Sequence, residues 1–139
     1  MSDALLAARL NAVCDWLQRY EPVRELPLGL YGAGPSAPAV LQAAAEHESI
    51  AAVVSRGGRP DTVDHGSLGK VSAPTLLIVG GLDDGGVKLH RSAYRALHCK
   101  KRFEIIPGAT HSFEEPGSLE VVARLTRGWF LQHAKTAYA

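Results

Sequence analysis

The chain has 139 residues, of which 46% are hydrophobic and 21% charged, and its formal net charge is +1. This length fits one domain, residues 1–139, that buries roughly two-thirds of the surface of its unfolded chain. A near-neutral charge gives no field that favours nucleic acid or an anionic membrane, and no apolar run approaches the roughly 18 residues that span a bilayer. Because no signal peptide is visible, we expect a cytoplasmic protein.

The first predicted element is a helix that begins at a cap, Ser2 or Asp3, and ends near Tyr20. After a connection that contains two prolines, an apolar strand at residues 28–31 leads into an alanine-rich helix at 38–47. A sharp, glycine-rich turn separates this strand from this helix.

The second apolar strand covers residues 50–54, and we expect the segment 55–60 to be loop because of its two glycines and its proline. The remaining predicted elements alternate between strand and helix: a strand at 75–79, a helix at 87–97, a strand at 102–106 and a helix capped by Ser118. Such alternation is typical of βαβ units around a parallel sheet. The predicted fold class is therefore α/β, a three-layer sandwich with a short, mainly parallel sheet of about four strands.

The spacing of cysteine and histidine gives no sign of a metal site. Cys14 and Cys99 lie far apart without a C-x-x-C pair, and the six histidines form no H-E-x-x-H or other ligand pattern. We therefore predict that the protein needs no metal and no organic cofactor.

The turn after the first strand has the setting of a nucleophile elbow. Such an elbow needs G-x-S-x-G, in which a sharp turn lifts the serine hydroxyl above the sheet. In the segment 32–36, Gly-Ala-Gly-Pro-Ser, the third position is Gly34, and the nearest hydroxyl belongs to Ser36, two places later. Whether the chain keeps nucleophilic chemistry depends on this turn.

Further candidate groups follow the third and fourth predicted strands, at the sheet edge where ligands of such folds gather. Asp83 and Asp84 follow the third strand, and His111 follows the fourth, so the order matches the α/β-hydrolase triad of nucleophile, acid and histidine. Imidazole exchanges protons near neutral pH, and a carboxylate behind it fixes its tautomer. The alternative role for either aspartate is an Asx-turn or a helix cap.

Three segments carry a resemblance to a known family: 54–61 (VSRGGRPD), 73–81 (APTLLIVGG) and 107–117 (PGATHSFEEPG). With them, the chain resembles the dienelactone hydrolase-like branch of the α/β-hydrolase superfamily from Leu5 to about Leu131. The resemblance implies a truncated α/β-hydrolase fold in which Asp83 is the triad acid and His111 is the base. It aligns the family's nucleophile with Gly34.

The resemblance also reveals a second departure, because Pro35 has no N–H for the oxyanion hole that the family builds from this position. Ser36 offers a repair: it sits in a shifted frame, and the following residue, Ala37, keeps an N–H that can serve as oxyanion donor. The alternative is that Ser36 only caps the helix that follows.

Two arginines, Arg56 and Arg59, follow the second strand and are candidates for binding an anionic group of a substrate. The alternative is that they pair with carboxylates of the protein.

The leading hypothesis is a small serine hydrolase that acts on carboxylic esters. Ser36 would attack the ester, His111 would serve as acid and base, Asp83 would orient His111, and the Ala37 N–H would hold the oxyanion. The alternative is a catalytically inactive remnant of the fold that acts as a binding or interaction module. A weaker third hypothesis assigns the nucleophile to Asp83 or Cys99, although Cys99 is predicted at a helix end away from the strand tips.

The resemblance implies an open sheet edge. In the family, the strand at 28–31 is central and pairs with a strand from an N-terminal portion that does not match this chain. An unpaired apolar strand without lysine or interior proline favours association. We therefore expect a homodimer.

Overall fold

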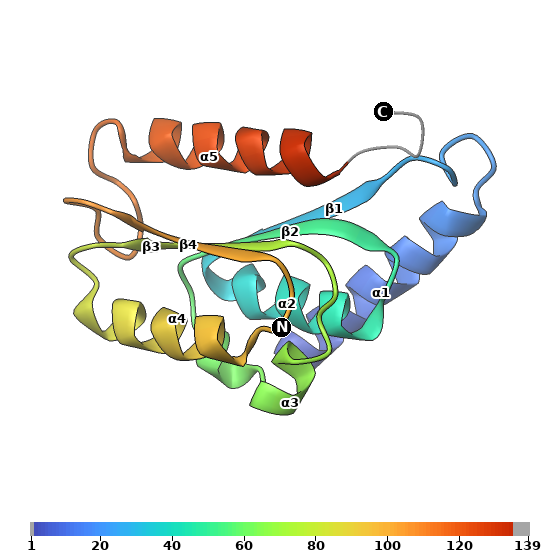
Figure 1. Ribbon diagram of the computed structural model, residues 1–139, viewed down its shortest axis with the longest axis horizontal. Coiled ribbons are helices and arrows are strands. Elements are labelled where there is room, and N and C mark those ends of the chain that lie inside the picture. The colour runs from blue at the N-terminus through green and yellow to red at the C-terminus, as the bar shows by residue number, and fades with distance from the viewer. Residues whose placement is uncertain (1, 135–139) are drawn as a thin grey trace.

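The computed structural model describes residues 2–134 (Figure 1). Its elements, in chain order, are α1 (Asp3–Arg19), β1 (Leu28–Ala33), the 3-10 turn η1 (Gly34–Ser36), α2 (Ala37–Glu46), β2 (Ile50–Arg56), the 3-10 turn η2 (Pro60–Thr62), α3 (His65–Leu68), β3 (Thr75–Gly80), α4 (Asp84–Ala96), β4 (Lys101–Ile106) and α5 (Ser118–His133). The predicted α/β class is confirmed.

The four strands form one parallel sheet in the order β1-β2-β3-β4. Consecutive strands are neighbours, so each crossover covers a single strand spacing. Every residue of β3 is buried, which explains why this segment reads as a continuous apolar run rather than an alternating one. β1 and β4 are the two edges.

Helices cover both faces of the sheet (Figure 1). The helices that connect the strands, α2, α3 and α4, lie with α1 on one face, whereas α5 lies alone on the other. This division follows from the strand order, because right-handed crossovers that all advance in one direction place their helices on the same face. The rule leaves free the two helices that connect no strands: α1, which lies with the crossover helices, and α5, which covers the opposite face.

Each face has its own hydrophobic core. The core under α1, α2 and α4 is the larger, and its fully buried members include Leu41, Val53, Leu68 and Leu77. The core under α5 centres on Val54, Ile78, Phe113 and Trp129. Burying a side chain of this size contributes about 1.5–3 kcal/mol.

Ser2 caps α1, as predicted, by accepting a hydrogen bond from the Leu5 N–H at 3.1 Å. At α5 the prediction was wrong. The N-cap is Gly117, with φ of 86°, and Ser118 is the first helical residue. The left-handed conformation at this position favours glycine over serine.

The predicted loop 55–60 was also partly wrong, because Ser55 and Arg56 belong to β2. Arg56 pairs with Ala33 of β1 on one side and with Ile78 of β3 on the other, so ladder hydrogen bonds extend the strand past its apolar run. Helix α4 begins at Asp84, three residues earlier than predicted. None of the helices within residues 2–134 is long and apolar enough to cross a membrane.

Candidate functional site

The turn after β1 is built as an elbow with Gly34 at its apex. Gly34 has φ of +54°, and a Cβ built on it would meet no atom within 4 Å. Gly32 is required two residues earlier, because a Cβ there would lie 2.6 Å from the Ser36 carbonyl oxygen. The backbone thus provides the strained, open position that a nucleophile occupies in G-x-S-x-G, but the residue there carries no side chain.

The Ser36 hydroxyl points back toward the end of β1. Its Oγ accepts a hydrogen bond from the Ala33 N–H at 3.0 Å and donates one to the Ala33 carbonyl at 2.9 Å. Ser36 occupies the N-cap position of α2, yet its side chain makes no capping bond to that helix. It closes the 3-10 turn instead, and both functions of the hydroxyl are in use.

The predicted oxyanion donor is also engaged. The Ala37 N–H donates to the Gly34 carbonyl, and Ala37 is fully buried. In this conformation the Ala37 N–H is already bonded, so it must leave the Gly34 carbonyl before it can serve as the predicted oxyanion donor. The cause is the tight 3-10 turn, whose i→i+3 bonds use the first N–H of the following helix.

Asp83 is the N-cap of α4, where its Oδ1 accepts a hydrogen bond from the Gly86 N–H at 3.1 Å. This is the capping role weighed as the alternative. Asp84, its rival, is exposed in the first turn of α4. The turn between β3 and α4 contacts the loop that follows β4, because the Leu82 N–H donates a hydrogen bond to the Ala109 carbonyl at 2.9 Å.

His111 lies exposed on a loop that the Glu115 carboxylate closes through hydrogen bonds to Thr110. Glu115 accepts hydrogen bonds from the Thr110 N–H at 2.8 Å and from the Thr110 hydroxyl at 2.7 Å. These bonds, more than the nearby His111 charge, hold the pKa of Glu115 below its usual range. Phe113 lies between Thr110 and Glu115 in the sequence. It is buried and has φ of 56°, a strained conformation for a bulky residue. The loop therefore presents His111 on a fixed backbone.

The two arginines differ in their surroundings. Arg59 is exposed and forms an ion pair with Asp61 at 2.7 Å, the alternative considered for it. Arg56 has no carboxylate at ion-pair distance within residues 2–134. Its Nε donates to the Tyr31 hydroxyl at 3.0 Å, and its guanidinium lies 4.8 Å from the centre of the Phe113 ring.

The loops that follow the strands meet at one edge of the sheet. A Cβ on Gly58 would lie 2.2 Å from the Gly34 carbonyl oxygen, and one on Gly57 would lie 3.5 Å from the His111 carbonyl oxygen. The backbone thus brings the predicted segments together. No hydrogen bond within residues 2–134 joins Ser36, Asp83 and His111 to one another.

Sequence reasoning missed His90, which is fully buried behind this edge. Its Nδ1 lies 2.7 Å from the Gly86 carbonyl oxygen and its Nε2 lies 3.2 Å from that of Gly57. Burial lowers the pKa of His90, against the opposing effects of these carbonyls and of the Asp83 and Asp61 charges. The available signal was the position of His90 on the apolar stripe of an amphipathic helix, which indicates burial but not the two carbonyl contacts.

The residues at this edge carry acid–base groups but no cluster of metal ligands. Within the described chain, no three histidine, cysteine, aspartate or glutamate side chains are placed to hold a metal ion.

Comparison with known proteins identifies relatives of two kinds. No family model matches the chain. Two proteins from strains of Mycobacterium tuberculosis, both provisionally named phosphoribosyl transferases, are 49% identical to it over 130 residues. The match covers 93% of this chain and 29% of each of those proteins, so the chain spans less than a third of their length.

Among solved structures, a dienelactone hydrolase from Anabaena variabilis matches with a TM-score of 0.93 and 45% identity, over 96% of this chain and 62% of that one. Est1E from Butyrivibrio proteoclasticus matches with a TM-score of 0.75 at 16% identity, over 91% of this chain and 68% of that one. A cold-adapted esterase from an Arctic intertidal metagenomic library matches with a TM-score of 0.76 at 17% identity, over 96% of this chain and 60% of that one. Residues 2–134 therefore have an α/β-hydrolase fold whose structural neighbours are a dienelactone hydrolase and several esterases.

Proposed function

We propose that this chain is a hydrolase-fold domain that binds a small carboxylic ester without using Ser36 as a nucleophile. The observation that carries the proposal is the elbow. Gly34 holds the apex conformation with open space above it, and the only hydroxyl of the turn is bound on both sides to Ala33.

Two further observations support binding rather than turnover. Pro35 and Ala37 leave the turn without a free N–H at the positions where an oxyanion donor would be needed, and such a donor is worth about 10²–10³ in kcat. His111 remains exposed on a fixed loop, where it can donate a hydrogen bond to a ligand carbonyl.

The relatives from M. tuberculosis support an accessory role. In them the matching region makes up 29% of a longer protein that bears the name of a different activity, phosphoribosyl transfer. We infer that the domain works beside such an activity as a binding or interaction module.

The second candidate is the carboxylic ester hydrolase with Ser36, Asp83 and His111 as its triad, supported by the dienelactone hydrolase and the esterase among the structural neighbours. For this function the Ser36 side chain must rotate away from Ala33 and give up two hydrogen bonds. Asp83 must likewise turn from Gly86 toward His111.

Titration of the ¹⁵N-labelled protein with methyl butyrate distinguishes the two candidates. We expect the backbone signals of Gly34 and His111 to shift saturably while the ester stays intact. His111→Ala should weaken binding, and the matched change His65→Ala, at an exposed histidine outside the site, should not. Hydrolysis that Ser36→Ala and His111→Ala each reduce by several orders of magnitude would instead establish the second candidate.

We propose that the open edge of β1 associates with a second copy of the chain. Within residues 2–134 this strand pairs only with β2, and it contains no lysine or proline to blunt its outer edge. The opposite edge, β4, carries Lys101, Arg102 and Glu104.

Light scattering at micromolar concentration should therefore give about twice the chain mass of 14.8 kDa. Tyr31→Lys, which places a charge on the exposed side of β1, should give the single-chain mass. A wild-type mass of one chain contradicts this proposal.

A further inference from the structure

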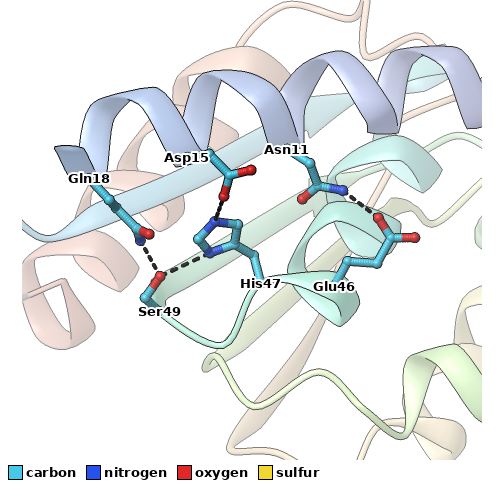
Figure 2. Close-up of polar contacts among 6 residues, drawn as sticks. All are labelled: Asn11, Asp15, Gln18, Glu46, His47 and Ser49. Atoms are coloured by element: carbon cyan, nitrogen blue, oxygen red, sulfur yellow. Dashed lines mark hydrogen bonds and ion pairs between the residues drawn. The ribbon is translucent and has the colours of Figure 1, made fainter. Parts of the chain in front are cut away.

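A second group of polar side chains joins α1 to the segment between α2 and β2 (Figure 2). His47 Nε2 lies 2.9 Å from Asp15 Oδ1, and the Ser49 hydroxyl lies 2.9 Å from His47 Nδ1. Gln18 donates its side-chain amide to the same Ser49 oxygen.

The fold explains why these residues meet. Asn11, Asp15 and Gln18 are spaced by four and three residues along α1, so they share one face of that helix. His47 is the C-cap of α2, and Ser49 directly precedes the first residue of β2. Figure 2 shows the face of α1 above this connection, with Asn11 bound to Glu46 at one end and Gln18 bound to Ser49 at the other.

The contacts fix the tautomer of His47. A carboxylate only accepts hydrogen bonds, so Nε2 carries the ring proton toward Asp15, and Nδ1 is left to accept from the Ser49 hydroxyl. A hydroxyl in contact with a base that a third group orients is the arrangement of an activated nucleophile. The His47 side chain is 12% exposed, whereas Ser49 is open to solvent.

A small, largely apolar surface pocket adjoins this group of side chains through Gln18. Gln18 forms part of its wall, and the Leu28 that also lines it pairs in register with Ile50, the neighbour of Ser49. Its volume is about 190 Å³, the space of about six water molecules. The other lining residues are Leu17, Val23, Arg24, Leu26 and Pro27.

The geometry points to Ser49 as a nucleophile for aryl esters of short apolar acids, with His47 as its base, Asp15 orienting His47, and Gln18 donating to the oxyanion. Ser49 Oγ forms a bond to the acyl carbon as its proton passes to His47 Nδ1. The bond from that carbon to the phenolic oxygen breaks, and the phenolate takes the proton. Water then hydrolyses the acyl-Ser49 ester with His47 again as base, which releases the acid and restores the hydroxyl.

The site is independent of the elbow. It lies at the amino end of β2, whereas Gly34 follows the carboxyl end of β1, and the two strands are parallel. The chain also contains a matched comparison. Ser92 lies 3.4 Å from His65 Nε2, and no carboxylate within the described residues is bound to that histidine.

The test is reaction of the full chain with a fluorophosphonate, followed by mapping of the adduct by mass spectrometry, and turnover of p-nitrophenyl butyrate. We expect the adduct on Ser49, and about a 100-fold or greater loss of labelling rate in His47→Ala, since a positioned base contributes at least this much. Ser49→Ala should remove the adduct and the turnover, whereas Ser92→Ala should change neither. p-Nitrophenyl decanoate should react more slowly than the butyrate, because the cavity is too small for its chain.

An unlabelled wild-type chain overturns this inference and leaves the proposed function intact. An adduct confined to Ser36 overturns both. If the labelling of Ser49 is unchanged in His47→Ala, Ser49 is only an exposed hydroxyl, and the inference is overturned. Mapping of the adduct on the wild-type protein does not depend on the folding of any variant.

Discussion

Replacing Gly34 by serine and Pro35 by alanine together should create an elbow that fluorophosphonates label. A serine at position 34 would have φ near +54° with open space around its Cβ, the arrangement of the nucleophile in this type of turn. The left-handed conformation costs about 1–3 kcal/mol for a residue other than glycine. Because Pro35 withholds one oxyanion donor, the double variant should react about 10²–10³ times faster than Gly34→Ser alone.

The measurement is the rate of adduct formation at position 34, followed by mass spectrometry of the peptide. Gly108→Ser is the matched control, because it also places a serine at positive φ, +75°, with no atom near its Cβ. That serine lacks the elbow and should stay unlabelled. Equal rates for the single and double variants would show that the N–H at position 35 is not needed.

The second large effect is on stability. Gly58→Ala should lower the free energy of unfolding by about 2–5 kcal/mol, the sum of the cost of a left-handed residue and of an overpacked contact. Gly58 has φ of +72°, and a Cβ there would lie 2.2 Å from the Gly34 carbonyl oxygen and 3.2 Å from the Ala37 side chain. Since the whole free energy of unfolding of a domain is about 5–15 kcal/mol, this change removes a large part of its stability.

Urea denaturation of both variants separates the two costs. Gly108→Ala has almost the same φ but open space at its Cβ, so it should lose only about 1–2 kcal/mol. The difference between the variants then measures the contact between the β2 loop and the elbow. Equal losses would mean that the loop moves aside without cost.

The strands could be predicted because their apolar runs, such as 75–79, need burial on both faces and tolerate little else. Their ends could not, because the extension of β2 through Ser55 and Arg56 depends on ladder bonds to two neighbours that the local sequence does not contain. The shape of the elbow and the place of Gly34 at its third position were implied by the sequence, whereas the φ of +54° at Gly34 and the open space around it came from the structure.

The residue types at the site could be predicted, but the allocation of their hydrogen bonds could not. Ser36 can bind a substrate or a backbone group equally well by composition, and the outcome depends on a 3-10 turn that competes for it. Arg59 found its partner two residues away, whereas the bond between Asp15 and His47 spans 32 residues. Contacts of that range follow from helix packing, which no local pattern encodes.

The position of His90 has a consequence for motion. A neutral imidazole has one ring proton, and the two carbonyl oxygens on either side of it cannot both receive that proton. We assign it to Nδ1, which makes the shorter contact, 2.7 Å to Gly86 against 3.2 Å to Gly57, and the Gly57 carbonyl then faces a lone pair. The loop after β2 is therefore the less restrained of the two segments, so amide exchange in it should be faster than in the first turn of α4.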